Sequence, residues 1–142
     1  MRRPEAAQYA AARRLLALET SEAEDAEGSA AVGARVHEKL FSSLASLVGT
    51  AGARALFARS TKLAATDFPS FRNADFNAEA PVSELLGKAL LGEPPAVIAE
   101  ASVALCATLL SLLATLIGEP LTTKVLQSVW PAFDGTNEET KR

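Results

Sequence analysis

Residues 97–117 read VIAEASVALCATLLSLLATLI, and Glu100 is the only charged residue among them. On a helix this run forms two adjacent leucine-rich stripes, while the remaining side carries small or weakly polar residues. A helix that is apolar over most of its circumference is normally buried on most sides. Each leucine removed from water contributes about 1.5–3 kcal/mol, so the run predicts the central helix of a small bundle.

The same run is long enough to cross a membrane, which requires about 20 apolar residues. Several features argue against a span. Glu100 lies inside the run, hydroxyl residues interrupt it, and Glu93 and Glu119 lie at its ends instead of a basic cluster. The neighbouring segments are amphipathic and need a partner to cover their apolar faces. We therefore expect a soluble core helix, and a membrane-inserted hairpin remains the alternative.

The segments before and after the run have helical spacing. We expect helices over 29–48, 51–65, 82–91 and 121–130, with Gly49 ending the first of these. Glycine and proline separate the run from its neighbours on both sides. Half of the chain is hydrophobic, mostly Ala and Leu, which are good helix formers. These patterns predict an all-α fold, a bundle of about four to five helices around residues 97–117.

The N-terminal segment reads as an amphipathic helix over residues 5–18, with Tyr9, Leu15 and Leu16 on its apolar side. An acidic stretch with no basic residue, ETSEAEDAEGS, follows and indicates either a solvated linker or a frayed acidic continuation of the helix. We therefore divide the chain into three parts: an N-terminal amphipathic helical arm with its acidic linker (1–28), a helical bundle domain (29–133) and a disordered polar tail (134–142).

Two further sets of residues are candidate contact surfaces. Phe68, Phe71 and Phe76 lie in the loop over 66–81; such residues most often anchor a loop on the core, but an exposed patch would mark a binding site. The small residues Ala107, Ser111 and Ala114 would let another backbone approach closely, in this domain or in a second copy. We expect a homodimer.

We find no catalytic, cofactor, metal or nucleotide signature. The chain has one His and one Cys, and no glycine-rich phosphate loop. The lone Cys106 cannot form an internal disulfide and lies among leucines, which favours a reduced, cytoplasmic setting and an inert thiol. A net charge of -3 gives no general reason to bind nucleic acid. We expect no enzymatic activity, no cofactor and no metal.

The segment around His37, AVGARVHEKLFSSLASLVG, resembles one helix of the histidine phosphotransfer domain. In that helical bundle an exposed histidine is followed by a lysine and by small residues, and Lys39 with Ser42 and Ser43 fits this pattern. The glycine of the pattern is replaced here by Phe41 or Ser42. The resemblance implies a signalling bundle, and the alternative is a surface histidine with no role.

Basic residues gather in the second helix and the loop that follows it, namely Arg54, Arg59, Lys62 and Arg72. They form either an ordinary solvated face or one patch that the acidic linker could cover. The chain is best interpreted as a non-enzymatic interaction or regulatory module that binds a protein partner through an apolar groove or through its arm. The alternative is a membrane-associated or membrane-inserting helical protein. The contact residues we expect are Tyr9, Leu15, Leu16, Phe68, Phe71 and Phe76.

Overall fold

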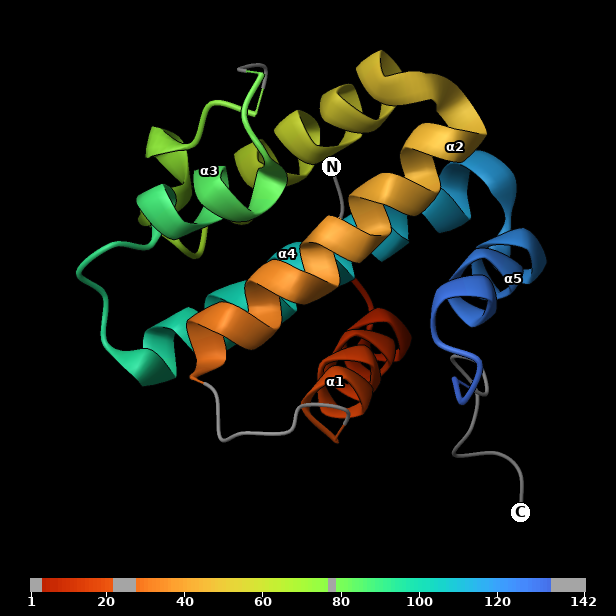
Figure 1. Ribbon diagram of the computed structural model, residues 1–142, viewed down its shortest axis with the longest axis horizontal. Coiled ribbons are helices and arrows are strands. Elements are labelled where there is room, and N and C mark those ends of the chain that lie inside the picture. Colours follow the sequence, from red (N-terminus) through yellow and green to blue (C-terminus); the bar gives the residue numbers. More distant parts are fainter. Residues whose placement is uncertain (1–3, 22–27, 77–78, 134–142) are drawn as a thin grey trace.

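The computed structural model describes residues 4–21, 28–76 and 79–133. This part of the chain contains five α-helices, one short 3-10 helix and no strand, which confirms the all-α fold (Figure 1). The elements in chain order are α1 (Ala6–Ser21), α2 (Ser29–Ala64), η1 (Pro69–Asn73), α3 (Val82–Ala89), α4 (Pro95–Ile117) and α5 (Glu119–Val129). The acidic residues 22–27 and the tail over 134–142 lie outside the described residues.

The apolar run forms α4, and it is the central helix as predicted. All residues from Ala101 to Leu110 are buried, together with Leu112 and Leu113. Helices α1, α2 and α5 all pack against α4, and Figure 1 shows it crossing the middle of the molecule behind α2. The leucine stripes are therefore covered from several sides, which explains why the run carries almost no charge.

Two glycines end the long helices. Gly49 bends α2 into two halves with φ 88° and ψ 158°, and Gly118 separates α4 from α5 with φ 89° and ψ 158°. Positive φ is a conformation that side chains with a Cβ rarely adopt, so glycine is the residue that can turn the chain at these points. The expected end of the first helix at Gly49 is confirmed.

The first half of α2 and α4 run in the same direction and touch closely. A Cβ placed on Gly33 would overlap the hydroxyl of Ser102, so the absence of a side chain at Gly33 allows the two helices to meet there. Leu47 lies 14 residues after Gly33, and Leu116 lies 14 residues after Ser102. At 1.5 Å per residue both leucines stand about 21 Å beyond the contact, at the same end of the bundle.

Helix α1 belongs to the same core as the rest of the molecule. Ala11, Ala12 and Leu15 are buried in one cluster that continues to Phe133, and α1 packs against both α4 and α2. The sequence separates residues 1–28 from the bundle as an arm, whereas the structure lays this helix on α4. The physical reason is that α4 is apolar around most of its circumference, and α1 covers a part of that surface.

Candidate functional site

Large apolar side chains are exposed at one end of the bundle. Leu47 and Val48 precede the bend of α2, Leu116 lies in the last turn of α4 and Leu121 in the first turn of α5. Their exposed fractions are 53%, 47%, 65% and 54% in that order. We call these four residues the apolar end. The bend of α2 and the α4–α5 turn lie at the same end of the molecule in Figure 1, and α2 contacts both α4 and α5. Groups of exposed large apolar side chains often mark interaction sites, so this end of the bundle is a candidate contact surface.

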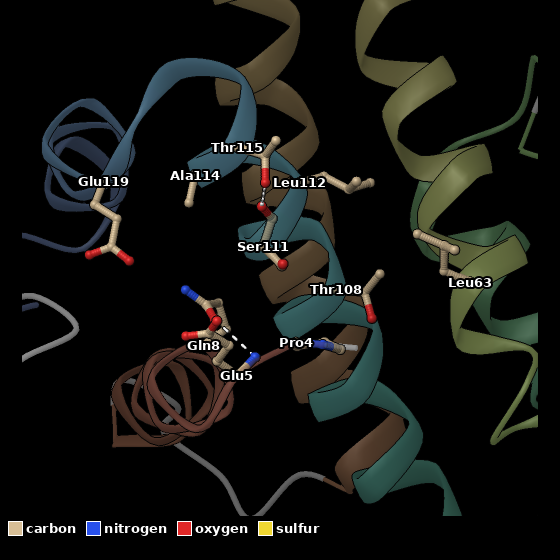
Figure 2. Close-up of a pocket in the computed structure, with 10 residues that line it drawn as sticks. All are labelled: Pro4, Glu5, Gln8, Leu63, Thr108, Ser111, Leu112, Ala114, Thr115 and Glu119. Atoms are coloured by element: carbon tan, nitrogen blue, oxygen red, sulfur yellow. Dashed lines mark hydrogen bonds between the residues drawn. The ribbon is translucent and has the colours of Figure 1, made fainter. Parts of the chain in front are cut away.

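A hollow of about 400 Å³ begins beside the apolar end, at the α4–α5 turn (Figure 2). Ser111, Ala114 and Thr115 of α4 line its wall, with Gln8 on one side and Leu63 on the other. The hydroxyl of Thr115 donates to the carbonyl of Ser111, so it is already satisfied within the helix. The α4 wall of the hollow therefore presents small side chains, whereas Glu5, Gln8 and Glu119 give the lining polar and charged groups on the other side.

The structure brings together only part of the predicted small-residue face. Ser111 and Ala114 line the hollow, while Ala107, one helical turn earlier on α4, is fully buried. Ala107 therefore contributes to packing inside this molecule, and the surface that a second copy could reach begins at Ser111.

The residues predicted for contact by the arm are divided between core and surface. Leu15 is completely buried, Leu16 and Tyr9 are partly buried against the core, and the Arg13 guanidinium lies 5.8 Å from the centre of the Tyr9 ring. Leu15 is thus not available to a partner while α1 lies on α4.

The phenylalanines after α2 hold that segment on the core. Phe71 and Phe76 are buried, and the Phe76 ring stacks on Phe57 with centroids 5.9 Å apart. Phe68 is partly buried and meets Phe71 edge-on. Of the two readings that the sequence left open, the structure favours the anchor, so Phe71 and Phe76 do not form an exposed contact patch. Their burial stabilises a stretch that has only one short 3-10 helix of its own.

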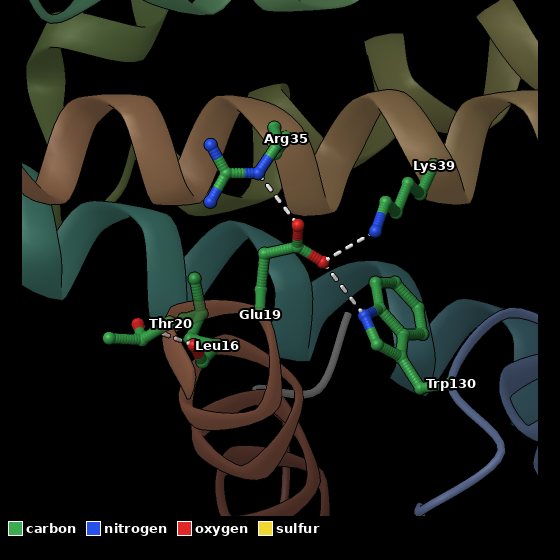
Figure 3. Close-up of polar contacts among 6 residues, drawn as sticks. All are labelled: Leu16, Glu19, Thr20, Arg35, Lys39 and Trp130. Carbon is green, nitrogen blue, oxygen red and sulfur yellow. Dashed lines mark hydrogen bonds and ion pairs between the residues drawn. The ribbon is translucent and has the colours of Figure 1, made fainter. Parts of the chain in front are cut away.

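A buried polar cluster, which sequence reasoning missed, joins α1 to α2 and to the C-terminal end of α5 (Figure 3). The Glu19 carboxylate accepts hydrogen bonds from Arg35 Nε at 2.6 Å, Lys39 Nζ at 2.9 Å and Trp130 Nε1 at 3.0 Å. We call these four residues the Glu19 cluster. Burial raises the pKa of Glu19, but the three hydrogen bonds outweigh it and hold the pKa below its ordinary value.

For Glu19 the linker interpretation is therefore wrong, and the helix continues past this residue to Ser21. Glu19 lies in the last turns of α1 and is almost fully buried, because two cations and an indole N–H compensate its charge. The spacing of Arg35 and Lys39, four residues apart on one helix face, was the one signal in the sequence that could have pointed to a shared carboxylate.

His37 is fully buried, so the expected surface position is wrong. Its Nδ1 lies 2.8 Å from the Gly33 carbonyl oxygen, and its ring meets Phe57 edge-on, because the second half of α2 folds back over it. Burial lowers the pKa of His37 to about 4. Phosphotransfer requires a histidine that a second domain can reach, and His37 is not in such a position.

Burial raises the pKa of the Cys106 thiol to about 12, which leaves that thiol inert.

The described residues contain no group of three or more His, Cys, Asp or Glu side chains that could hold a metal ion. Two helical segments are long and apolar enough to cross a membrane by length and composition alone: Ala30–Ala64, with mean hydropathy 1.3, and Pro95–Ile117, with mean hydropathy 2.1. The core helix of a soluble protein has the same length and composition, and 67% of the most apolar 18-residue stretch of α4 is buried inside the molecule.

Comparison of the chain with models of known protein families, with curated proteins and with solved structures found no match.

Proposed function

We propose that this chain is a non-enzymatic helical interaction module that binds a protein partner, in the first instance a second copy of itself, through the apolar end. The observation that carries the proposal is the exposure of Leu47, Val48, Leu116 and Leu121, each about half exposed or more. All four lie at the end of the molecule where α2 bends and α4 is followed by α5. Burying such side chains against another protein is favourable because apolar surface leaves water.

The position of the apolar end supports an interface between two copies. A two-fold interface is self-complementary, so a protruding group of leucines can pack against the same group of the second copy. The neighbouring hollow offers small residues at Ser111 and Ala114. A stable interface buries about 800 Å² on each partner, so the interface would have to extend from the apolar end over neighbouring surface such as the hollow.

The test is light scattering on a size-exclusion column in detergent-free buffer. We expect the wild type to elute as a dimer at micromolar concentration, and Leu116→Glu and Leu47→Glu to be monomers, because a charge buried in an apolar interface is unfavourable. Leu91→Glu is the matched control: Leu91 is 84% exposed but lies between α3 and α4, so that variant should remain dimeric. A wild type that stays monomeric at all concentrations and elutes like Leu116→Glu would refute self-association.

A second candidate is a membrane-associated helical protein, supported by the two segments that have the length and hydropathy of spans. Here the apolar end would enter lipid first, and α4 would follow after α1 and α2 release it. Flotation with liposomes separates the two candidates. Co-flotation of the wild type that is lost in Leu116→Glu and kept in Leu91→Glu would favour the membrane, whereas a dimer that does not float favours the interaction module.

A further inference from the structure

We propose that the hollow between the second half of α2 and η1 binds a small organic anion, an aromatic or aliphatic body that carries a phosphate or carboxylate group. The hollow has a volume of about 440 Å³. Arg59 and Lys62 of α2 and Arg72 of η1 line it, and we call it the basic hollow. Sites for small ligands have volumes of about 300–1,000 Å³, so the space is sufficient for such a molecule.

The fold brings the three cations to one place from two elements. Arg59 and Lys62 are three residues apart, so they share one face of α2. Arg72 belongs to η1, which packs directly against α2 and is held there by the buried Phe71. The three charges therefore face a common space on a rigid support, since burial of Phe71 and Phe76 fixes the segment that carries Arg72.

The charge balance of the basic hollow differs from that of the chain. The chain has a net charge of -3, yet the hollow is lined by three cations and by one carboxylate, Asp75. No hydrogen bond or ion pair links Arg59, Lys62 or Arg72 to another side chain within the described ranges. Three like charges with only one carboxylate in the same lining repel one another, and an anionic ligand would relieve that repulsion.

Other basic residues of the molecule show the contrast. Arg35 and Lys39 bind Glu19, and Arg54 donates to the carbonyl of Ala80 at 2.9 Å while its guanidinium covers the Phe41 ring. Arg54, which the sequence grouped with the other three, is therefore a structural residue. The cations of the basic hollow differ from these in that no ion pair or hydrogen bond within the described residues compensates them, and they share one space.

The lining indicates which anion fits. Ala58, Ala65 and Ala74 form apolar wall, and the aliphatic parts of Arg59 and Lys62 extend it. A guanidinium can pair with two oxygens of a phosphate or carboxylate and can also stack on a flat ring. A ligand with a ring and an anionic group uses both features, whereas an inorganic ion uses only the charges.

The test is a titration of the isotope-labelled full chain with phenyl phosphate, followed by backbone amide shifts. We expect saturable shifts at residues 58–62 and 71–75, with weaker binding of benzoate and inorganic phosphate and none of phenol. Arg59→Ala, Lys62→Ala and Arg72→Ala should each weaken binding about threefold to fivefold, as solvent-exposed charge pairs do. Lys124→Ala, on α5, removes the same charge elsewhere and should leave the affinity within about twofold.

All four substituted residues are exposed, so the variants are expected to fold, and circular dichroism verifies this. The proposal is overturned if the three hollow variants bind phenyl phosphate like Lys124→Ala, or if the shifts lie outside the hollow. If inorganic phosphate binds as tightly as phenyl phosphate, the proposal that the ligand carries an apolar body is refuted. Because the apolar end lies elsewhere, the oligomeric state of these variants is independent of the result.

Discussion

Burial of His37 in its neutral form makes the stability of the protein depend on pH. Its pKa is about 4 in the folded protein and 6.5 in an unfolded chain, so between these values the unfolded state binds more protons. The contribution of His37 is fully present above pH 6.5 and falls as the pH drops towards 4. At pH 4 the contribution of His37 to the free energy of unfolding is therefore smaller by about 3 kcal/mol than above pH 6.5.

Urea denaturation at pH 7.5, 6.0, 5.0 and 4.5 measures this loss. We expect the free energy of unfolding of the wild type to decline steadily below pH 6.5, and that of His37→Gln to be lower at pH 7.5 but nearly flat down to pH 5. Glu19 contributes in the same direction only at lower pH, because its lowered pKa means that its stabilisation is lost as the carboxylate is protonated. Parallel curves for the wild type and His37→Gln would show that His37 is not buried as the structure has it.

Glu19 stabilises the junction of three helices through its charge. In Glu19→Gln the amide keeps the size of the side chain but loses the pairing with Arg35 and Lys39, which are themselves about one-third exposed. We expect a loss of about 1–3 kcal/mol, less than for a fully buried pair because water screens the two cations. The exposed Glu84→Gln, next to Lys88, should change the stability by less than about 0.5 kcal/mol in the same urea experiment.

Neither of these residues could be assigned from local pattern. Glu19 is 16 and 20 residues from its cations and 111 from Trp130. Within a short stretch of sequence, Glu19 therefore has only the acidic residues after it as charged neighbours, and its cationic partners cannot be recognised. His37 follows the buried Val36 directly, and it is covered only because the chain turns back at Gly49. Tertiary contacts, which no periodicity contains, decide both positions.

At the scale of the elements, glycines and prolines predicted where helices end, because the conformations at those points are nearly specific to these residues. Gly49 tests this reasoning. We expect Gly49→Ala to destabilise the protein by about 1–2 kcal/mol, since φ is 88° there although nothing crowds a Cβ. Gly87→Ala is the matched control, because Gly87 is exposed within α3 in open space and alanine should stabilise that helix by about 0.5–1 kcal/mol. Thermal unfolding measures both effects: the midpoint should fall in Gly49→Ala and rise in Gly87→Ala. A higher midpoint in Gly49→Ala would contradict the positive φ at the bend of α2.

The helices and their apolar faces followed from spacing, but the surface that each face covers did not. The pattern over residues 5–18 showed that α1 has an apolar side, and both a partner protein and α4 could have covered it. Likewise, the phenylalanines after α2 could have been anchors or an exposed patch. The candidate site was less predictable still, because Leu47, Leu116 and Leu121 fit helical patterns and their exposure depends on how the bundle ends.

For the molecule as a whole, the docking of α1 decides whether the protein unfolds as one unit. Leu15 is completely buried and Leu16 only partly, so Leu15→Ala should cost about 2–5 kcal/mol and Leu16→Ala clearly less. If α1 were an arm independent of the bundle, neither substitution would affect the stability of residues 29–133. Trp130 is the only tryptophan of the chain, and it donates to Glu19 of α1, so its fluorescence reports whether the N-terminal helix is in place.

We therefore expect fluorescence of Trp130 and circular dichroism at 222 nm to give the same urea midpoint in the wild type, as a single cooperative unit does. In Leu15→Ala both midpoints should fall together, because the core that α1 completes also holds α4. A fluorescence change that precedes the loss of helix would mean that α1 detaches while the bundle stays folded. In that case the α4 surface beneath α1 would become accessible before unfolding, and a partner could bind there instead of at the apolar end.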